Sequence, residues 1–318
     1  MNHLSLLALA LVVETFVGYP AILQSTIGHP VQWIGSLITY LDEGLNDDEA
    51  SARDRRIAGV MALIVIVLLP ALAATLVAWV LSKIPGGFLI NVLLATSLIA
   101  QKSLRDHVTI VATTLPRSLP EARIEVAKIV GRDVTTLDES GVAKAALETL
   151  AENTADGIVA PAFWYALLGL PGIVAYKAIN TADSMIGHKS ERYLSFGWAS
   201  ARFDDLVNLI PARLTGLLFA AAALLTSKSA AKSALTAMRR DAGKHRSLNA
   251  GWPEAAMAGA LGLKFGGPRD YQGERVDLPV MGEGREQLTA SDIHAGLQLY
   301  EYSLVLLLAL AVILAMVL

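Results

Sequence analysis

The sequence predicts an all-α fold, that of a polytopic integral membrane protein whose polar regions form amphipathic helices. Hydrophobic residues make up 54% of the 318 residues and charged residues only 17%, whereas about a quarter of an average soluble domain is charged. Several apolar runs approach the roughly 20 residues that a helix needs to cross a bilayer. The polar stretches between these runs repeat apolar residues at helical spacing.

Residues 1–100 are expected to form N-terminal membrane helices and a connecting His-Pro-Val loop. Leu4–Val13 is interpreted as a retained helix, because no basic residue precedes it as in a signal peptide. Ile57–Ser82 is the strongest span, with Pro70 expected to kink it. Phe88–Ala100 is a shorter companion.

Residues 101–157 are predicted to be a polar region of amphipathic helices. The spacings Ser118 to Glu121 and Thr136 to Glu139 both match the capping box, in which a hydroxyl and an acid three residues apart satisfy the first helical N–H groups. Two helices are therefore expected, each with one apolar face.

Residues 158–226 are expected to hold central membrane segments, and their topology stays open. Ile158–Ile179 is interrupted at Gly169–Gly172, so neither arm alone can cross a bilayer. It is either a kinked span or a re-entrant hairpin, and the polar residues at both ends slightly favour the hairpin. Leu206–Thr226 is the last candidate span of this region.

Residues 227–302 are predicted to be a polar basic region and 303–318 a C-terminal membrane helix. The basic stretch 228–246 is expected to be cytoplasmic, because lysine and arginine concentrate on that side. Each full crossing moves the chain to the other side of the membrane. The stretch 228–246 therefore lies in the cytoplasm only if both central segments span the membrane or if neither does.

The composition excludes several classes of function. A formal net charge of −3 argues against a general nucleic-acid-binding protein. The absence of cysteine excludes disulfides, thiolate metal sites and a cysteine nucleophile. The six histidines are too far apart for an HExxH zinc site, and neither the P-loop nor the GxGxxG pattern is present.

Polar residues gather at the edges of the central apolar segments, where they indicate chemistry on phosphates. Asp204, Asp205 and Asn208 fall within about one helical turn, with Asp205 and Asn208 on a shared face. Such hard oxygen ligands suit Mg²⁺, and arginines can hold phosphate oxygens in pairs. The other candidates in these stretches are Glu152, Asn153, Asp156, Asn180, Asp183, Arg192, Arg202 and Arg213.

Each group also has an ordinary structural interpretation. Acids cap helices and stabilise helix N-termini, and a run of Asn, Asp and Gly is common in turns. His29 before Pro30 could only fix a turn, and the run from Asn249 to Glu254 contains Trp252, a plausible interfacial anchor. Glu14, which directly follows the first apolar run, is open to either interpretation.

The candidates belong to an ordered series of motifs that covers nearly the whole chain. The most specific strings are Glu152-Asn153-Thr154-Ala155-Asp156-Gly157, Asn180-Thr181-Ala182-Asp183-Ser184-Met185 and the run from Asn249 to Leu261. The others are His29-Pro30-Val31, Gly131-Arg132-Asp133, Gly197 to Arg202, Asp204-Asp205, Pro211-Ala212-Arg213 and Gly266-Gly267-Pro268. This series resembles the CobD/CbiB family, the adenosylcobinamide-phosphate synthases of cobalamin (vitamin B12) biosynthesis. The sequence departs from the family pattern at Glu14, at Tyr19 and at His188-Lys189-Ser190.

The resemblance implies an ATP-dependent amide ligase, a multi-pass protein of the cell (inner) membrane. It would join the corrinoid adenosylcobyric acid to (R)-1-aminopropan-2-ol or its O-phosphate, giving adenosylcobinamide or its phosphate. ATP would be a substrate and Mg²⁺ the cofactor. Expected partners are the two small-molecule substrates, the lipid bilayer and other late cobalamin-pathway membrane enzymes, but no nucleic acid.

The chemistry that the resemblance implies assigns a role to each candidate. The metal ligands would be Asp204, Asp205 and Asn208. The catalytic residues would be Glu152, Asp156, Asp183 and His29, with Glu152 or His29 as the base and Asp156 or Asp183 assisting with Mg²⁺. Substrate and phosphate would be bound by Asn153, Asn180, Arg192, Arg202, Arg213, Asn249 and Glu254.

Two other functions fit parts of the sequence. A membrane phosphotransferase would also use an Asp/Asp/Asn turn beside a membrane helix. A non-enzymatic transporter or an AmpE-like membrane sensor is favoured by the broken apolar segment 158–179, because discontinuous helices mark transporter sites.

Overall fold

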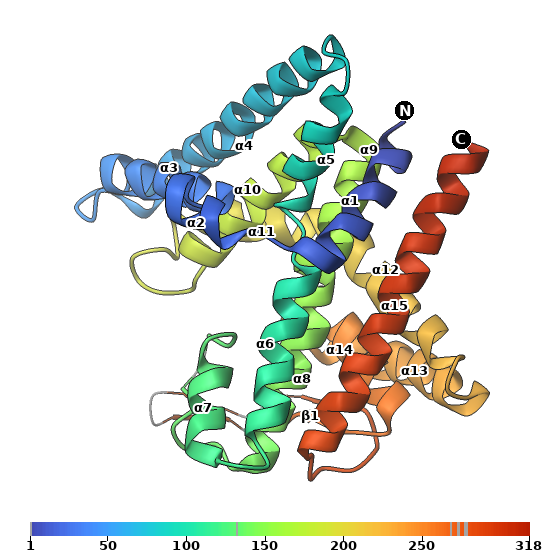
Figure 1. Cartoon of the computed structure of the whole chain (residues 1–318). Helices are drawn as coiled ribbons and strands as arrows, with labels where there is room; N and C mark the ends of the chain where they lie inside the picture. Colours follow the sequence, from blue (N-terminus) through green and yellow to red (C-terminus); the bar gives the residue numbers. More distant parts are fainter. Residues whose placement is uncertain (1, 132, 268, 272–273, 277–278) are drawn as a thin grey trace. The chain divides into compact units, whose positions relative to one another are not determined.

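The chain adopts the predicted all-α class, with membrane-length apolar helices and polar helical regions. The computed structural model describes residues 2–131, 133–267, 269–271, 274–276 and 279–318 (Figure 1). Within these ranges, strands are limited to pieces of two or three residues. Two motif residues, Arg132 and Pro268, lie outside the described residues.

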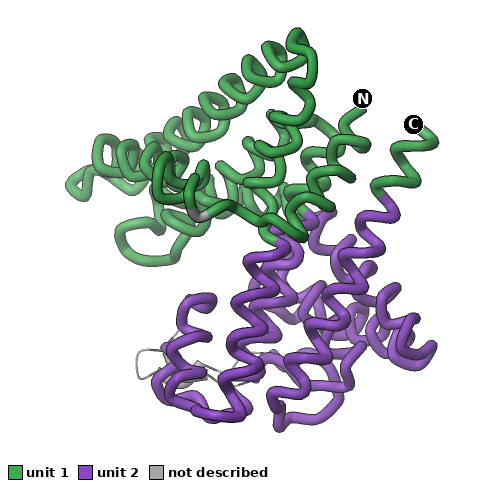
Figure 2. Tube along the Cα trace, viewed as in Figure 1, with its two compact units in different colours: residues 1–100, 160–208, 311–318 green, residues 101–159, 209–310 purple. Residues whose placement is uncertain are grey.

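The chain divides into two compact units, each assembled from separate segments (Figure 2). Unit 1 contains residues 1–100, 160–208 and 311–318, and unit 2 contains residues 101–159 and 209–310. The helices of unit 1 are α1 (His3–Val17), α2 (Ala21–Ile27), α3 (Pro30–Leu45), α4 (Ala52–Ser82), α5 (Gly87–Thr96), α9 (Ala160–Leu168), α10 (Leu170–Ile186) and α11 (Trp198–Val207).

Unit 2 contains the polar helices and the short strands. Its helical elements are α6 (Gln101–Thr114), α7 (Leu119–Ala127), α8 (Glu139–Thr154), a π-helical turn (Ala155–Val159), α12 (Leu209–Ala223), α13 (Lys228–Asp241), a 3₁₀ turn (Ala242–Lys244), α14 (Gly251–Leu261) and most of α15 (Ala290–Val317). Its strands are β1 (Phe265–Gly266), β2 (Arg269–Tyr271), β3 (Glu274–Val276) and β4 (Val280–Met281), paired antiparallel as β1–β4 and β2–β3.

Three helical segments of the described chain are long and apolar enough to cross a membrane: Ala52–Ser82, Gly87–Thr114 and Ala290–Val317. The second of them consists of α5, α6 and the short connection between them. The three segments contain the predicted spans that begin at Ile57, Phe88 and Ser303. Two helix pairs, His3–Val17 with Ile22–Leu45 and Trp198–Val207 with Leu209–Ala223, qualify only when each pair is taken together across a bend. Large apolar side chains lie exposed along α4, as lipid-facing positions would be.

The segment from Ile158 to Ile179 is broken at the predicted interruption into two helices that pack as a helical hairpin, and whether it is re-entrant or a kinked span stays a prediction. α9 and α10 pack against each other and are joined at Gly169, whose φ of +67° most residues avoid. A Cβ atom on Gly172 would lie 2.3 Å from the carbonyl oxygen of Trp164, so the two backbones meet where only glycine fits. The second half of α10 contains the polar residues Asn180 and Asp183, so their positions depend on how α10 packs in this hairpin.

A shared apolar core fixes α3, α4, α10 and α11 within unit 1. Its buried members are Ile34, Ile38, Ala62, Leu63, Ile66, Ala178, Ala182, Ile186, Phe196 and Ala199. The α4 backbone also contacts the loop before α11, because a Cβ atom on Gly59 would lie 1.9 Å from the carbonyl oxygen of Phe196. The position of α11 against α10 is therefore set by packing on both sides.

Of the two predicted helix caps, one is confirmed and one is wrong. The Ser118 hydroxyl accepts the N–H of Glu121 at 3.4 Å. Thr136 does not cap α8, which begins at Glu139 after Asp138. The Asp138 carboxylate accepts the N–H of Gly141 at 2.7 Å, and aspartate is among the strongest N-cap residues.

In unit 2, Asp241 at the end of α13 fixes the loop that leads to α15. Its carboxylate is 1% exposed and accepts hydrogen bonds from Arg240, from Lys244 at 2.8 Å and from the N–H of Gly282 at 2.9 Å. These donors hold the pKa of Asp241 well below its ordinary value despite burial. The carboxylate therefore stays charged and joins helix and loop.

Candidate functional site

The most complete group of predicted site residues lies between α10 and α11 in unit 1. The two helices run antiparallel: the Tyr176 hydroxyl donates to the Asn208 side chain at 3.0 Å, and one turn further the Asn180 amide donates to Asp204 at 3.4 Å. Asn208 also donates to the other oxygen of Asp204 at 3.0 Å. Asp204 is 9% exposed. Its carboxylate is therefore largely buried, and the amides of Asn180 and Asn208 donate to its two oxygens.

Within the predicted metal turn, the Asn208 amide donates to Asp204, four residues earlier. Asp205 forms an ion pair with Arg202 at 3.5 Å. The Arg202 side chain is 64% exposed, so most of its guanidinium is accessible to a phosphate.

Asp183 is a third carboxylate of this region, near the end of α10. Burial raises its pKa, the charge of Asp205 raises it further, and His188 opposes both effects. Gly187 makes room for this carboxylate, because a Cβ atom there would lie 2.0 Å from an Asp183 oxygen. The backbone at Gly187 therefore leaves space for the Asp183 carboxylate, and burial of this carboxylate raises its pKa.

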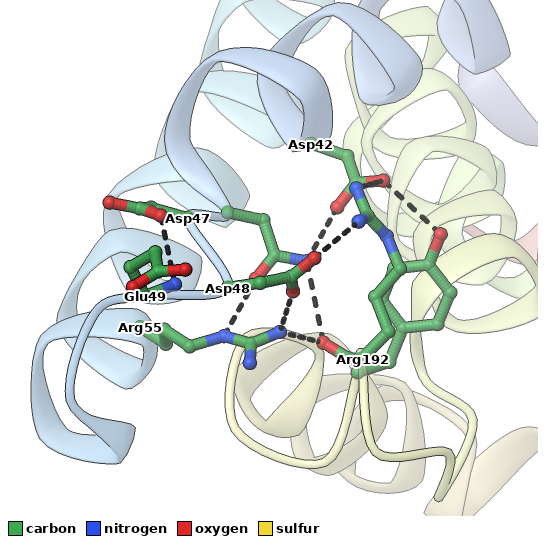
Figure 3. A network of polar contacts seen from close by, with 8 residues as sticks. Asp42, Asp47, Asp48, Glu49, Arg55 and Arg192 are labelled. Carbon is green, nitrogen blue, oxygen red and sulfur yellow. Dashed lines mark hydrogen bonds and ion pairs between the residues drawn. The ribbon is translucent and has the colours of Figure 1, made fainter.

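Arg192 lies in a polar network between α3, α4 and the loop that joins α10 to α11 (Figure 3). Its guanidinium donates to Asp42 at 3.1 Å and pairs with Asp48 at 3.3 Å. Asp42, only 7% exposed, also accepts the Tyr193 hydroxyl at 3.1 Å. Arg55 donates to the backbone carbonyl of Arg192 and pairs with Asp48 at 3.1 Å. Arg192 therefore anchors this loop, and its contact with a substrate phosphate stays a prediction.

His29 is used at the start of α3, as its structural interpretation expected. Its Nδ1 accepts the N–H of Val31 at 3.2 Å, and the backbone N–H of His29 donates to the side chain of Gln32 at 2.8 Å. The ring of Tyr19 packs edge-on at 4.5 Å between centroids. The Nδ1 atom is thus engaged in capping, the imidazole also forms a hydrogen bond with the backbone of Ser97, and the role of His29 as a base stays a prediction.

The predicted residues of unit 2 lie at two places. Glu152 and Asn153 are exposed at the end of α8, and Asp156 lies in the π-helical turn that follows. Such turns often occur at functional sites. The sequence suggests an ordinary turn here, because the residues before Gly157 favour turns and single-residue patterns do not distinguish π from α geometry.

The second place in unit 2 is the start of α14. Arg213 of α12 lies over the ring of Trp252, 4.4 Å from its centroid, so this tryptophan has an intramolecular partner. Glu254 is 5% exposed and faces His245 at 3.7 Å. Asn249 is buried beside them in the chain. Arg213, Asn249 and Glu254 are therefore built into the helix packing of unit 2.

Three residues near the predicted site residues are not themselves predicted from the sequence: His245, Asp42 and Ser200. His245 stands outside the motif run, four residues before Asn249. Asp42 lies in an acidic stretch typical of a solvated surface, and only the fold reveals its partner 150 residues away. Ser200 lies inside the Gly197–Arg202 motif but has no charge to draw notice. The motif itself is the one signal that could have found it.

The residues around Asp204 fit a Mg²⁺ ion bound together with phosphate. Carboxylate and amide oxygens are hard ligands, and Mg²⁺ is usually held by one or two carboxylates plus phosphates and water. A cation would also relieve the repulsion between Asp183 and Asp205. Within the described chain, no three His, Asp or Glu side chains are arranged to hold a metal alone, so part of the coordination would come from substrate and water.

Comparisons with known proteins extend over nearly the whole chain. The model of a family described as "CobD/Cbib protein" matches residues 7–300. A protein of Sinorhizobium sp described as "Cobalamin biosynthesis protein CobD" is 50% identical over 301 residues, which is 93% of each chain. Proteins of the same description from Rhodobacter capsulatus and Brucella suis are 50% and 46% identical over 302 and 304 residues, 94% and 93% of this chain and 93% and 92% of their own. No solved structure matches the chain.

Proposed function

Because the chain belongs to the CobD/CbiB family, an enzyme family of cobalamin biosynthesis, we propose that it is an ATP-dependent amide ligase. It joins a free propionate carboxylate of adenosylcobyric acid to the amine of (R)-1-aminopropan-2-ol or its O-phosphate. The observation that carries the proposal is the family match over residues 7–300, which includes every motif around Asp204.

A carboxylate does not react with an amine until it is activated, and this demand sets the steps. The terminal phosphoryl group of ATP passes to a carboxylate oxygen, giving an acyl phosphate and ADP. The amine nitrogen then attacks the carbonyl carbon, the C–N bond forms, and the bond to phosphate oxygen breaks. The amine proton passes to a base, and inorganic phosphate leaves.

The side chains around Asp204 suit the phosphoryl step. Asp204, Asp205 and Asn208 would hold Mg²⁺, which when bound neutralises charge that develops on the phosphate oxygens. Arg202 is exposed enough to bind a phosphate oxygen directly. Glu152 is the proposed base for the amine, with His29 as the alternative.

The proposal is tested with the purified full chain, adenosylcobyric acid, ATP and Mg²⁺, offering in turn the amino alcohol and its phosphate. We expect a corrinoid product whose mass corresponds to the new amide, together with one ADP for each amide. Product formation without ATP, or its absence with every amine offered to folded protein, would contradict the proposal.

The α9–α10 hairpin also supports the transporter alternative, because broken helices line transport sites. A transporter would move a corrinoid or an amino alcohol into sealed vesicles without forming an amide. Measuring uptake and product mass on the same reconstituted vesicles separates the two functions.

A further inference from the structure

We propose that the hydroxyl of Ser200 is a further ligand of the Mg²⁺ ion proposed to bind at Asp204, on the side of that carboxylate where Asp183 would assist. The inference rests on the proposed function, because that function supplies the phosphate-bound cation. It starts from an unexplained buried group and from the register of two helices.

Ser200 is a buried polar group without a partner. It is 0% exposed, and its Oγ has no hydrogen-bond partner among the described residues. Leaving a buried hydroxyl without a hydrogen bond is unfavourable, because the group loses its hydration and gains no partner. Several other buried hydroxyls bond a carbonyl one turn earlier, as Thr154 does to Leu150 at 2.6 Å and Thr215 does to Pro211 at 2.8 Å. Ser200 lies in the first turn of α11, where no helical residue stands four positions earlier.

The helix geometry places this hydroxyl beside the acids. Ser200 and Asp204 are four residues apart on the buried face of α11, the spacing at which Asn208 contacts Asp204. The Tyr176–Asn208 and Asn180–Asp204 hydrogen bonds fix the antiparallel register of α10 and α11 in steps of four residues. Four residues further along α10 and four residues earlier in α11, the same register would pair Ser184 with Ser200. Ser184 directly follows Asp183 in the sequence.

The backbones also approach each other at the end where this register would continue. A Cβ atom on Gly197 would lie 1.6 Å from the carbonyl oxygen of Ile186, so the loop before α11 touches the last turn of α10. In the same turn, Gly187 leaves space for the Asp183 carboxylate. The register therefore places Ser200 one turn from Asp204 on its own helix and near the level of Asp183 on the facing helix.

This arrangement has the chemistry of a hard-cation site. A neutral hydroxyl adds an oxygen ligand without adding negative charge to a region that already holds Asp183, Asp204 and Asp205. Binding a cation would satisfy the orphaned hydroxyl and offset the repulsion of the carboxylates. Neither effect requires any other residue to move into the site.

The first test is Mn²⁺ binding to the full chain in detergent, measured by the electron paramagnetic resonance signal of free Mn²⁺. Ser200→Ala should weaken binding about 10-fold. Its unfolding temperature without divalent ions should stay equal to that of the wild type or rise, because an unsatisfied hydroxyl has been removed. Ser303→Ala is the matched control: Ser303 is 1% exposed, but its hydroxyl donates to Tyr300 at 2.7 Å, so Mn²⁺ binding should not change.

The second test uses Ser200→Cys, which introduces the one thiol of a chain without cysteine. Because soft sulfur prefers soft metals, this variant should bind Cd²⁺ more tightly than the wild type, and Cd²⁺ should slow alkylation of the thiol. Unchanged Mn²⁺ affinity in Ser200→Ala, or equal Cd²⁺ affinity in Ser200→Cys, would overturn the proposal while leaving the ligase intact. Loss of amide formation in the wild type would instead contradict the proposed function.

Discussion

Asp204 is the acidic side chain of the candidate site with the most defined surroundings, since two amides hold its oxygens in a buried place. Sequence spacing alone places it within a turn of Asn208. Its contact with Asn180 depends on how α10 packs on α11, and no periodicity within one helix reports that. The candidate residues could therefore be predicted, but their partners could not.

Replacing Asp204 by Asn should lower amide formation by about 100-fold, the scale seen when one electrostatic group of an active site is removed. The fold should be kept, because asparagine has the same shape and removes a buried charge. Product mass and size-exclusion profile measure the two effects. Asp54→Asn, an exposed position on α4, is the control, and retained turnover in Asp204→Asn would remove this residue from the metal role.

Asp183 should give the protein a measurable pH dependence. Its pKa is raised above the ordinary 3.8 by burial and by Asp205, so the folded state binds its proton more tightly than the unfolded state. Stability from this group is full below pH 3.8 and is lost as the pH rises through the raised value. Asp183→Asn should therefore gain on the wild type as the pH increases, in thermal unfolding without divalent ions.

Added Mg²⁺ serves as the control for this prediction. It should narrow the difference at neutral pH by stabilising the wild type, because a cation favours the charged carboxylate. Parallel stability curves for the two proteins across this pH range would show that Asp183 does not carry the effect.

At the scale of the elements, the sequence predicts helices better than their ends and connections. Apolar length predicts α4, and the Ser118 pattern predicts the start of α7. The start of α8 is missed because two capping residues, Thr136 and Asp138, compete and the capping-box pattern favours the wrong one. The π-helical turn after α8 and the Arg192 network depend on tertiary contacts.

The Arg192 network should act as the anchor of the loop between α10 and α11. Arg192→Gln removes a charged hydrogen bond to Asp42, which is buried, so it should lower the unfolding temperature. It should also speed proteolytic cleavage of this loop. Arg202→Gln is the matched control, since a single exposed ion pair contributes about 1 kcal/mol or less. Equal cleavage rates in both variants would contradict the anchor.

For the whole molecule, the side of the membrane occupied by α13 is the main prediction. The basic residues around this helix are expected to face the cytoplasm. Because the chain has no cysteine, Lys228→Cys gives a unique thiol at the exposed start of α13. A membrane-impermeant maleimide should label it in inverted vesicles but not in intact cells, with detergent-solubilised protein as the control. The opposite labelling pattern would place this helix outside.

The division of the chain into two units has a consequence for its synthesis. The chain passes from one unit to the other at residues 100, 159, 208 and 310, and the last segment, 311–318, belongs to the unit that contains residue 1. Residues 1–100 therefore emerge from the ribosome long before residues 311–318, which belong to the same unit. A chain made only as far as residue 309 contains neither unit whole, and removal of residues 311–318 shortens the unit whose first segment is made earlier.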